Sequence, residues 1–167
     1  MKNIKKIEYK RISYDETKEK LEKMIEELKT IKDFEKFLKI IREIIELQNE
    51  IEEMYDYADI QNMRALDDEF YKEEVEYWNA TKPKFDVLFV PFYQVMLDTE
   101  FKDKLNDVIP ENFFNTISSK IKITSDKVVD LKKRENELKS EYRSLNKISI
   151  DFDGESLTLP RIAKYFT

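Results

Sequence analysis

Five acidic side chains that lie close together could do chemistry: Asp67, Asp68, Glu69, Glu73 and Glu74. Carboxylate oxygens are the ligands that Mg²⁺ and Ca²⁺ prefer, so this cluster could hold such a cation. Acidic side chains also suit the first turn of a helix, where they interact favourably with the helix dipole. We favour the second interpretation, a helix start with a solvated face.

Most catalytic chemistry is excluded by residue types that the sequence lacks. It contains no histidine and no cysteine, which removes Ser-His-Asp triads, thiol nucleophiles and zinc sites built on these residues. Gly154 is its only glycine, so glycine-rich phosphate-binding loops are excluded as well. Paired carboxylates for glycoside hydrolysis are available, but no pattern places two of them about a pocket. We predict no catalytic and no metal-binding residue in this chain.

Four aromatic residues next to the acidic cluster could line a groove for an extended peptide: Phe70, Tyr71, Tyr77 and Trp78. Aromatic rings offer a large contact area at low entropic cost, which suits peptide recognition. The more usual alternative is that such rings form core between helices, and the two interpretations are compatible. The substrate-binding residues therefore remain unknown at this point.

The charge balance argues against nucleic acid as a partner. The chain has 30 basic and 36 acidic residues, a formal net charge of −6, which repels a phosphate backbone. Its N-terminal stretch is basic with interleaved tyrosines; the residues are Lys2, Lys5, Lys6, Tyr9, Lys10, Arg11 and Tyr14. We interpret this stretch as a solvated arm or edge segment.

No apolar run of signal-peptide length follows the basic N-terminus. The most apolar stretch, residues 85–97, is shorter than the roughly 20 residues that cross a bilayer, so we expect it in the core. Together with the absence of cysteine, these features predict a cytoplasmic protein without membrane contact.

Apolar spacing predicts two long helices at the start of the chain. Ser13 and Glu16 have the spacing of a capping box, and apolar residues then recur every three or four positions up to Ile31. Asp33 can cap the next helix, whose apolar stripe continues to Ala58 and which should end between residues 59 and 66. A connection of only a few residues predicts an antiparallel hairpin with coiled-coil-like packing.

Further helices are predicted along the rest of the chain. One begins at the acidic cluster, another at Thr81, and residues 85–97 form a helix that Pro91 kinks. Pro110 opens a helix that continues through Ile121, and Ser125 or Asp126 caps the last long helix. That helix has a narrow apolar stripe, formed by Val128, Leu131, Leu138, Tyr142 and Leu145.

The C-terminal residues change to period-two alternation on both sides of Asp153 and Gly154, which is typical of a β-hairpin. An isolated hairpin is marginal in water, so we expect it to dock on helices. Residues 159–167 resemble a helix that has just begun, which suggests a fragment truncated at its C-terminal end. The predicted fold is mainly α: one domain, residues 1–167, with a long-helix hairpin, a helical bundle and one small C-terminal β-hairpin.

Three stretches carry a resemblance to a known family: DEFYKEE (residues 68–74) followed by Pro83, NELKSEY (residues 136–142), and ISIDFDGE (residues 148–155) with LTL after it. In this order they resemble the N-terminal region of bacterial oligoendopeptidases, the oligoendopeptidase F and Pz-peptidase group of the thimet oligopeptidase family. The similarity extends from about Tyr14 to Thr167.

The resemblance implies a zinc metallopeptidase that encloses a deep channel and hydrolyses short peptides. In such enzymes the zinc ligands are two histidines of His-Glu-x-x-His and a downstream glutamate. This chain has no histidine, so these roles transfer to no position here, and zinc is expected in the missing catalytic part. The role that does transfer is architectural, a part of the channel wall that is inert alone. The alternative is a non-enzymatic helical interaction module, which an uncovered apolar stripe would cause to self-associate.

Overall fold

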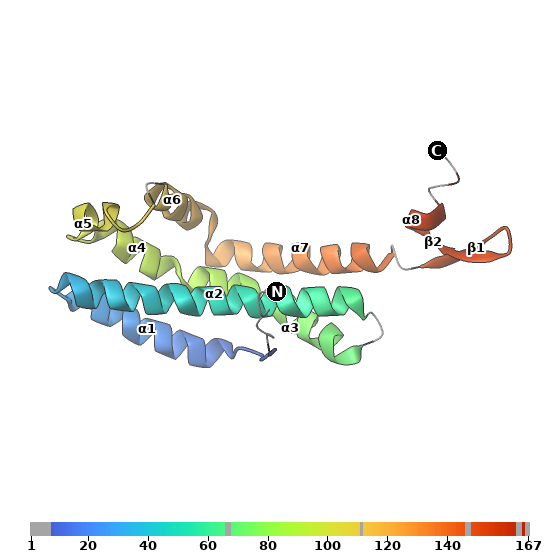
Figure 1. Ribbon diagram of the computed structural model, residues 1–167, viewed down its shortest axis with the longest axis horizontal. Helices are drawn as coiled ribbons and strands as arrows, with labels where there is room; N and C mark the ends of the chain where they lie inside the picture. Colours follow the sequence, from blue (N-terminus) through green and yellow to red (C-terminus); the bar gives the residue numbers. More distant parts are fainter. Residues whose placement is uncertain (1–7, 66–67, 111, 146–147, 163–164, 166–167) are drawn as a thin grey trace, which may run out of the picture.

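The computed structural model describes residues 8–65, 68–110, 112–145, 148–162 and 165. Within these residues the chain forms eight helices and one two-stranded antiparallel sheet. The helices build an elongated bundle, and the sheet lies beyond one end of it (Figure 1). The predicted class, mainly α with a long-helix hairpin and a small C-terminal β-hairpin, is confirmed.

The first two helices fold back on each other as predicted (Figure 1). α1 (Tyr14–Thr30) begins at Ser13, whose Oγ accepts a hydrogen bond from the Glu16 N–H at 3.4 Å. α2 (Phe34–Arg64) begins at Asp33, whose carboxylate accepts one from the Lys36 N–H at 2.9 Å. The 31 residues of α2 end within the predicted interval and span about 46 Å, so this helix sets the length of the bundle.

A second layer consists of α3 (Glu69–Leu88) and α4 (Val90–Asp98). The helix start predicted at Thr81 is wrong, because Thr81 lies inside α3 and its hydroxyl donates to the Tyr77 carbonyl at 2.7 Å. The apolar residues 85–97 are helical but are divided between α3 and α4 at Phe89. This break lies two residues before Pro91, whose ring removes the N–H that would continue the helical hydrogen bonds.

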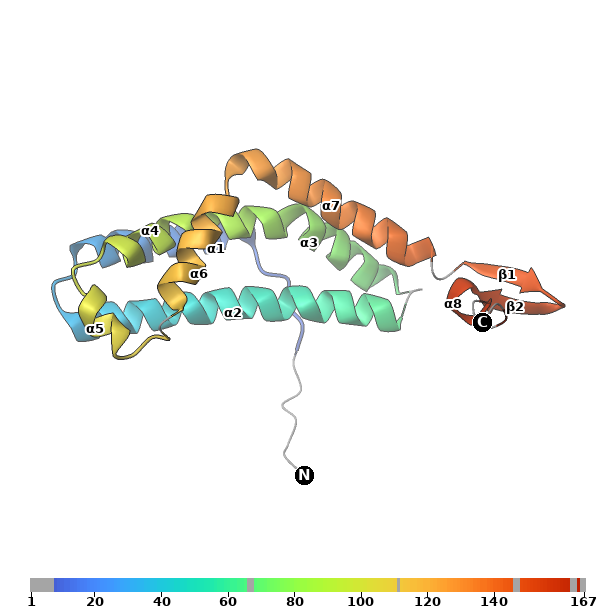
Figure 2. The same cartoon turned by 90° about the horizontal axis from the view of Figure 1, so that it is seen from above.

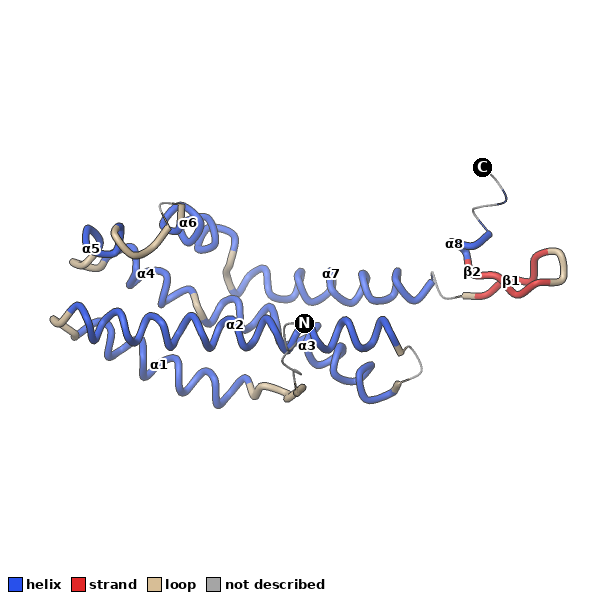
Figure 3. The backbone as a smooth tube through the Cα atoms, in the orientation of Figure 1, coloured by secondary structure: helices blue, strands red, loops and turns tan. Residues whose placement is uncertain are grey.

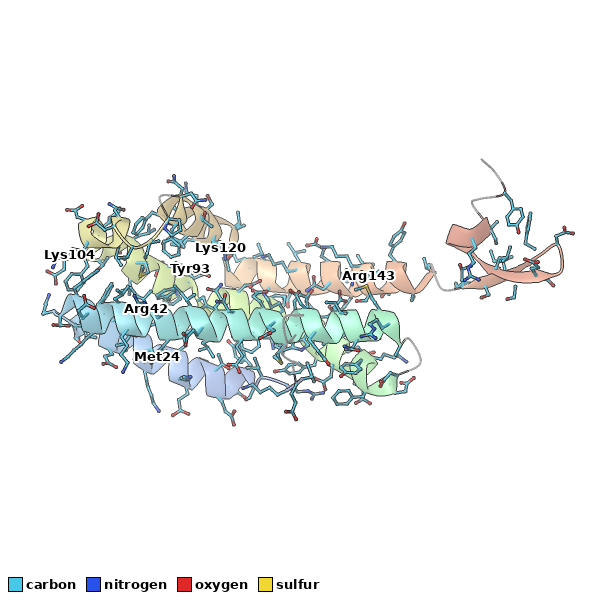
Figure 4. The ribbon with its side chains drawn as sticks, viewed as in Figure 1. Met24, Arg42, Tyr93, Lys104, Lys120 and Arg143 are labelled. Atoms are coloured by element: carbon cyan, nitrogen blue, oxygen red, sulfur yellow. The ribbon has the colours of Figure 1, made fainter. Side chains whose placement is uncertain are left out.

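Two short helices close one end of the bundle. α5 (Lys102–Asn106) is absent from the sequence-based expectation, and α6 (Phe113–Ile123) begins three residues after the predicted start at Pro110. The Pro110 carbonyl accepts a hydrogen bond from the Phe113 N–H at 2.9 Å, so Pro110 lies in the turn before the helix. α6 contacts α4 where Lys120 Nζ lies 5.6 Å from the centre of the Tyr93 ring (Figure 4).

The core lies between α1, α2, α3 and α4. The largest fully buried side chains are Trp78, Phe37, Phe85, Phe92, Leu21, Ile41, Ile44, Ile51, Met96 and Leu105. α7 (Asp126–Leu145) starts at the predicted position and runs along α3 (Figure 2), yet none of its described side chains is buried. Most of its predicted apolar stripe is exposed, because α7 meets α3 through a different face.

The hairpin consists of β1 (Ser149–Phe152) and β2 (Glu155–Thr158), with Ile150 opposite Leu157. Its turn has positive φ at Asp153 (54°) and Gly154 (81°), as an Asp-Gly hairpin turn requires. Among the described elements it packs only on α8 (Leu159–Ile162), a one-turn helix, so the expected docking on the bundle is not found (Figure 3). Residues 163, 164, 166 and 167, where the last helix was expected to continue, lie outside the described part.

Within the described ranges, no helix combines the length and the apolar character that a bilayer span requires.

Candidate functional site

The acidic and aromatic residues singled out in the sequence meet the N-terminal segment, residues 8–13, which crosses the bundle (Figure 2). Glu74 of α3 is buried, and its carboxylate accepts hydrogen bonds from the Tyr9 hydroxyl and from Nε of Arg11, the latter at 3.0 Å to each oxygen. A second guanidinium nitrogen of Arg11 completes the ion pair. Trp78 Nε1 donates to the Tyr9 oxygen at 3.0 Å. The Glu74 carboxylate thus binds Tyr9 and Arg11 directly and is linked to Trp78 through Tyr9.

This environment changes the acidity of both oxygen-bearing groups. Burial alone would raise the pKa of Glu74, but the hydrogen bonds from Arg11 and Tyr9 hold that pKa below its ordinary value of 4.5. Burial, together with the hydrogen bond to Glu74, raises the pKa of the Tyr9 hydroxyl. Glu74 is therefore ionised and Tyr9 neutral at physiological pH, and the carboxylate is fully engaged in holding the N-terminal segment.

Of the two alternatives predicted for the basic stretch, a solvated arm or an edge segment, residues 8–13 fit the edge segment. The Tyr77 hydroxyl donates to the Ile12 carbonyl at 2.6 Å, and the Arg11 guanidinium lies 4.8 Å from the centre of the Tyr77 ring. Lys10 forms an ion pair with Glu50 of α2. Lys2, Lys5 and Lys6 lie outside the described residues.

The aromatic residues form a cluster in which burial decreases towards the α2–α3 turn. Trp78 is completely buried, whereas Tyr71 and Tyr77 are half-buried and Phe70 is exposed. The Tyr9 ring lies within 6.0 Å of the rings of Tyr57, Phe70 and Tyr71, measured between centroids. The core interpretation is thus correct for Trp78, and Phe70 presents one exposed ring at the edge of the cluster.

The acidic cluster does not converge on one point. Asp68 accepts the Phe70 N–H at 3.0 Å as the cap of α3, and Glu69 pairs with Lys72. Glu74 turns to Arg11, and Asp67 lies outside the described residues. In the described part of the chain, no group of three or more acidic residues is arranged to hold a metal ion. Because the sequence also lacks histidine and cysteine, its residues do not fit the zinc ligand set of the resembling family.

A second buried charge, not anticipated from the sequence, lies between α2 and α3. Lys82 Nζ contacts Glu52 at 2.9 Å and Asp86 at 2.6 Å, and its side chain is largely buried. Burial alone would lower the pKa of Lys82, but the two carboxylates raise it above its ordinary value. Nearby, Gln48 Nε2 donates to the Tyr93 hydroxyl at 2.8 Å. These contacts stabilise the helix packing and leave no free nucleophile or base there.

Two surface hollows lie along α1, one of them next to α4 and the other next to the junction of α3 and α4. One, of about 600 Å³, runs past Leu28, Val95 and Phe101; the other, of about 550 Å³, has Ile25, Leu88 and Val87 among its lining residues. Lys29 and Pro91 line both hollows, so the two adjoin as one groove lined by apolar and charged side chains. Sequence patterns could not locate it, because it depends on how α4 turns away after Phe89.

Comparison with known proteins agrees with the resemblance. The sequence pattern of the family described as Peptidase M3 N-terminal domain matches residues 4–124. An oligoendopeptidase F structure from Bacillus anthracis str. Ames superposes with a TM-score of 0.89 and 29% identity, covering 97% of this chain and 30% of that one. Pz peptidase A, solved with an inhibitor, gives 0.88 at 24% identity, covering 96% of this chain and 29% of that one.

A further structure described as oligoendopeptidase F also has a TM-score of 0.88, at 22% identity, with 96% of this chain and 28% of that chain covered. No curated protein sequence matches this chain. The chain thus spans less than a third of the length of the structures it matches. With the family pattern matching most of the sequence and the fold shared throughout, the chain belongs to the Peptidase M3 N-terminal domain family.

Proposed function

We propose that this chain forms part of the channel wall of a zinc metalloendopeptidase that hydrolyses short peptides. The observation that carries the proposal is the family match over residues 4–124, together with structural similarity to oligoendopeptidase F over 97% of the chain. The engaged state of Glu74 and Lys82 supports a structural role, because Glu74 holds the N-terminal segment on α3 and Lys82 joins α3 to α2. In this proposal zinc and the catalytic residues belong to the part of the peptidase outside this chain.

The length and packing of α2 support the proposed wall role. α2 spans the length of the bundle, packed against α1 and α3, so it can present a long surface without bending. A stiff wall restricts a channel to peptides that are short or unfolded, which limits hydrolysis to such substrates. The chain alone is expected to be inert.

A chimaera tests this proposal. Residues 1–167 replace the matched 30% of the Bacillus anthracis oligoendopeptidase F, and cleavage of an internally quenched short peptide is followed. We expect turnover that a chelator abolishes and zinc restores, and no turnover by residues 1–167 alone. A matched substrate carries the same peptide within a folded protein loop and should resist cleavage.

Two results would contradict the proposal. One is a monodisperse, helical chimaera that cleaves no peptide although the recipient enzyme does. The other is chelator-sensitive turnover by the isolated chain, since this would require a zinc site that its residues do not offer.

A non-enzymatic helical interaction module is the second candidate function. The observation that favours it is the exposed apolar stripe of α7. This function would be supported if two copies of the isolated chain paired stably through that stripe and substitutions in the stripe left peptide cleavage by the chimaera unchanged.

A further inference from the structure

α7 turns a largely polar face towards α3 and carries most of its large apolar side chains on the opposite, exposed face. Two of its contacts with α3 and α2 are polar: Asn79 Nδ2 donates to Ser140 Oγ at 2.9 Å, and Arg143, labelled in Figure 4, pairs with Asp59 at 2.6 Å. Val128 and Val129 near its start are half-buried. The other apolar residues of α7 lie on the opposite face and are exposed; they are Leu131 (70%), Leu138 (47%), Tyr142 (67%) and Leu145 (50%). The spacing of seven, four and three residues places these four side chains on one face, which we name the α7 stripe.

The apolar surface continues beyond α7. Ile148 and Ile150 are also exposed, at 52% and 43%, and Tyr165 lies against Phe152 near the hairpin. Seven of the twelve large exposed hydrophobic residues in the described part of the chain lie between Leu131 and Tyr165. Scattered exposed hydrophobic residues are normal, but a contiguous concentration marks an interaction surface.

The hairpin is a second feature that lacks a packing surface among the described elements. Two-stranded hairpins are marginal in water unless they pack on a further surface. Here β1 and β2 contact only α8 among the described elements, and this helix has a single turn. The hairpin and the α7 stripe therefore both lack a covering layer, and they adjoin along the chain (Figure 3).

We propose that the α7 stripe and the hairpin together are the docking surface for the rest of the peptidase, the part of the related structures that this chain does not cover. This inference rests on the proposed function, because it takes its partner from the same family. The partner surface is apolar at its centre, complementary to a row of leucine and tyrosine side chains.

The length of the related structures favours this occupant over a second copy. The matches extend over 96–97% of this chain, so α7 and the hairpin lie within the shared fold. In those structures more than two-thirds of the polypeptide lies outside the shared fold, so a large partner surface belongs to the same chain. The α7 stripe and the hairpin with its flanking residues hold most of the large exposed hydrophobic side chains among the described residues.

The test is co-expression of tagged residues 1–167 with the part of the Bacillus anthracis oligoendopeptidase F that the match leaves uncovered. We expect the two polypeptides to co-purify in a 1:1 complex, measured by light scattering on a size-exclusion column. The double variant Leu131→Asp/Leu138→Asp should lower recovery of soluble partner at least about tenfold, because docking would bury two unpaired carboxylates. The matched control Val108→Asp changes an equally exposed apolar residue beyond α5 and should leave recovery unchanged.

Accessibility of the stripe provides a second measurement. The sequence has no cysteine, so Leu138→Cys and Val108→Cys each introduce a single thiol. We expect maleimide to label both quickly in the isolated chain, and Leu138→Cys at least about tenfold more slowly in the complex because burial excludes the reagent. Val108→Cys should react equally in both.

Three results would overturn the proposal. They are failure to recover soluble partner with the unchanged chain, equal recovery with the double variant, and a dimer of the isolated chain in which Leu138→Cys is already protected. The last result would identify a second copy as the occupant. A complex that forms but cleaves no peptide would contradict the proposed function and leave the docking surface supported.

Discussion

The indole N–H of Trp78 donates a hydrogen bond to the hydroxyl oxygen of Tyr9 at 3.0 Å, across 69 positions of the sequence. Tyr9→Phe removes this acceptor and leaves the indole N–H of buried Trp78 without a partner, whereas Glu74 loses one donor and keeps those of Arg11. We expect a loss of about 1–3 kcal/mol in the free energy of unfolding. Urea unfolding followed by Trp78 fluorescence measures it, because Trp78 is the only tryptophan.

The matched control is Tyr142→Phe on the exposed face of α7, which should change the free energy of unfolding by no more than about 0.5 kcal/mol. Equal losses in the two variants would show that the Tyr9 hydroxyl has no special role.

Glu74→Gln should destabilise the chain by about 2 kcal/mol, because Arg11 then loses the charge that its hydrogen bonds require. The folded-state pKa of Glu74 lies below its ordinary value of 4.5, so its ionised form stabilises the fold above that value. This contribution is lost as the pH falls through the folded-state pKa. The unfolding free energy of Glu74→Gln should therefore fall less steeply in acid than that of the unchanged chain, as urea titrations at a series of acidic pH values would show.

Glu73→Gln is the control for this acid dependence, since Glu73 is the exposed neighbour of Glu74. It should retain the acid slope of the unchanged chain. An equally flattened slope in Glu73→Gln would assign the effect to general charge repulsion.

Ser140→Ala should loosen α7 more than Arg143→Ala does. The first variant leaves the amide of buried Asn79 without its acceptor, at a cost of about 1–2 kcal/mol. The second removes an exposed ion pair with Asp59, worth about 0.2–1 kcal/mol. Hydrogen exchange of the α7 amides distinguishes them: faster exchange in Arg143→Ala than in Ser140→Ala would contradict this order.

Gly154→Ala should destabilise the hairpin by about 1 kcal/mol, because alanine resists the positive φ of 81° that the turn requires. A Cβ at this position would meet no atom within 4 Å, so the cost is purely conformational. Faster exchange should appear in β1 and β2, whereas unfolding reported by Trp78 should not shift. A shift of the Trp78 transition would show that the hairpin is coupled to the bundle.

The local signals of the sequence predict the helix starts well. Ser13, Asp33 and Asp68 each accept a backbone N–H of the first turn, and these interactions depend only on residues within three positions. The Thr81 and Pro110 predictions fail because threonine and proline also occur within helices and in the turns before them. Helix starts without a strong cap, such as α5, leave no local signal.

Long-range partnership is what the sequence does not reveal. Arg11 and Glu74 are 63 positions apart, and neither neighbourhood indicates that a basic N-terminal segment will be held by a carboxylate of α3. Periodicity correctly places Leu131 and Leu138 on one face of α7, but it cannot say whether that face meets the bundle or points away from it. The candidate surface therefore became visible only in three dimensions.

The polar contacts of α7 also determine the order in which the chain comes apart. The free energy needed to separate two packed helices rises with the apolar area that becomes exposed to water. No described side chain of α7 is buried, so little apolar area is exposed when α7 detaches. α7 should thus detach as an independent cooperative unit at denaturant concentrations that leave α1–α4 intact. The isolated protein then melts in two steps, and limited proteolysis trims it to a protease-resistant remnant centred on Trp78.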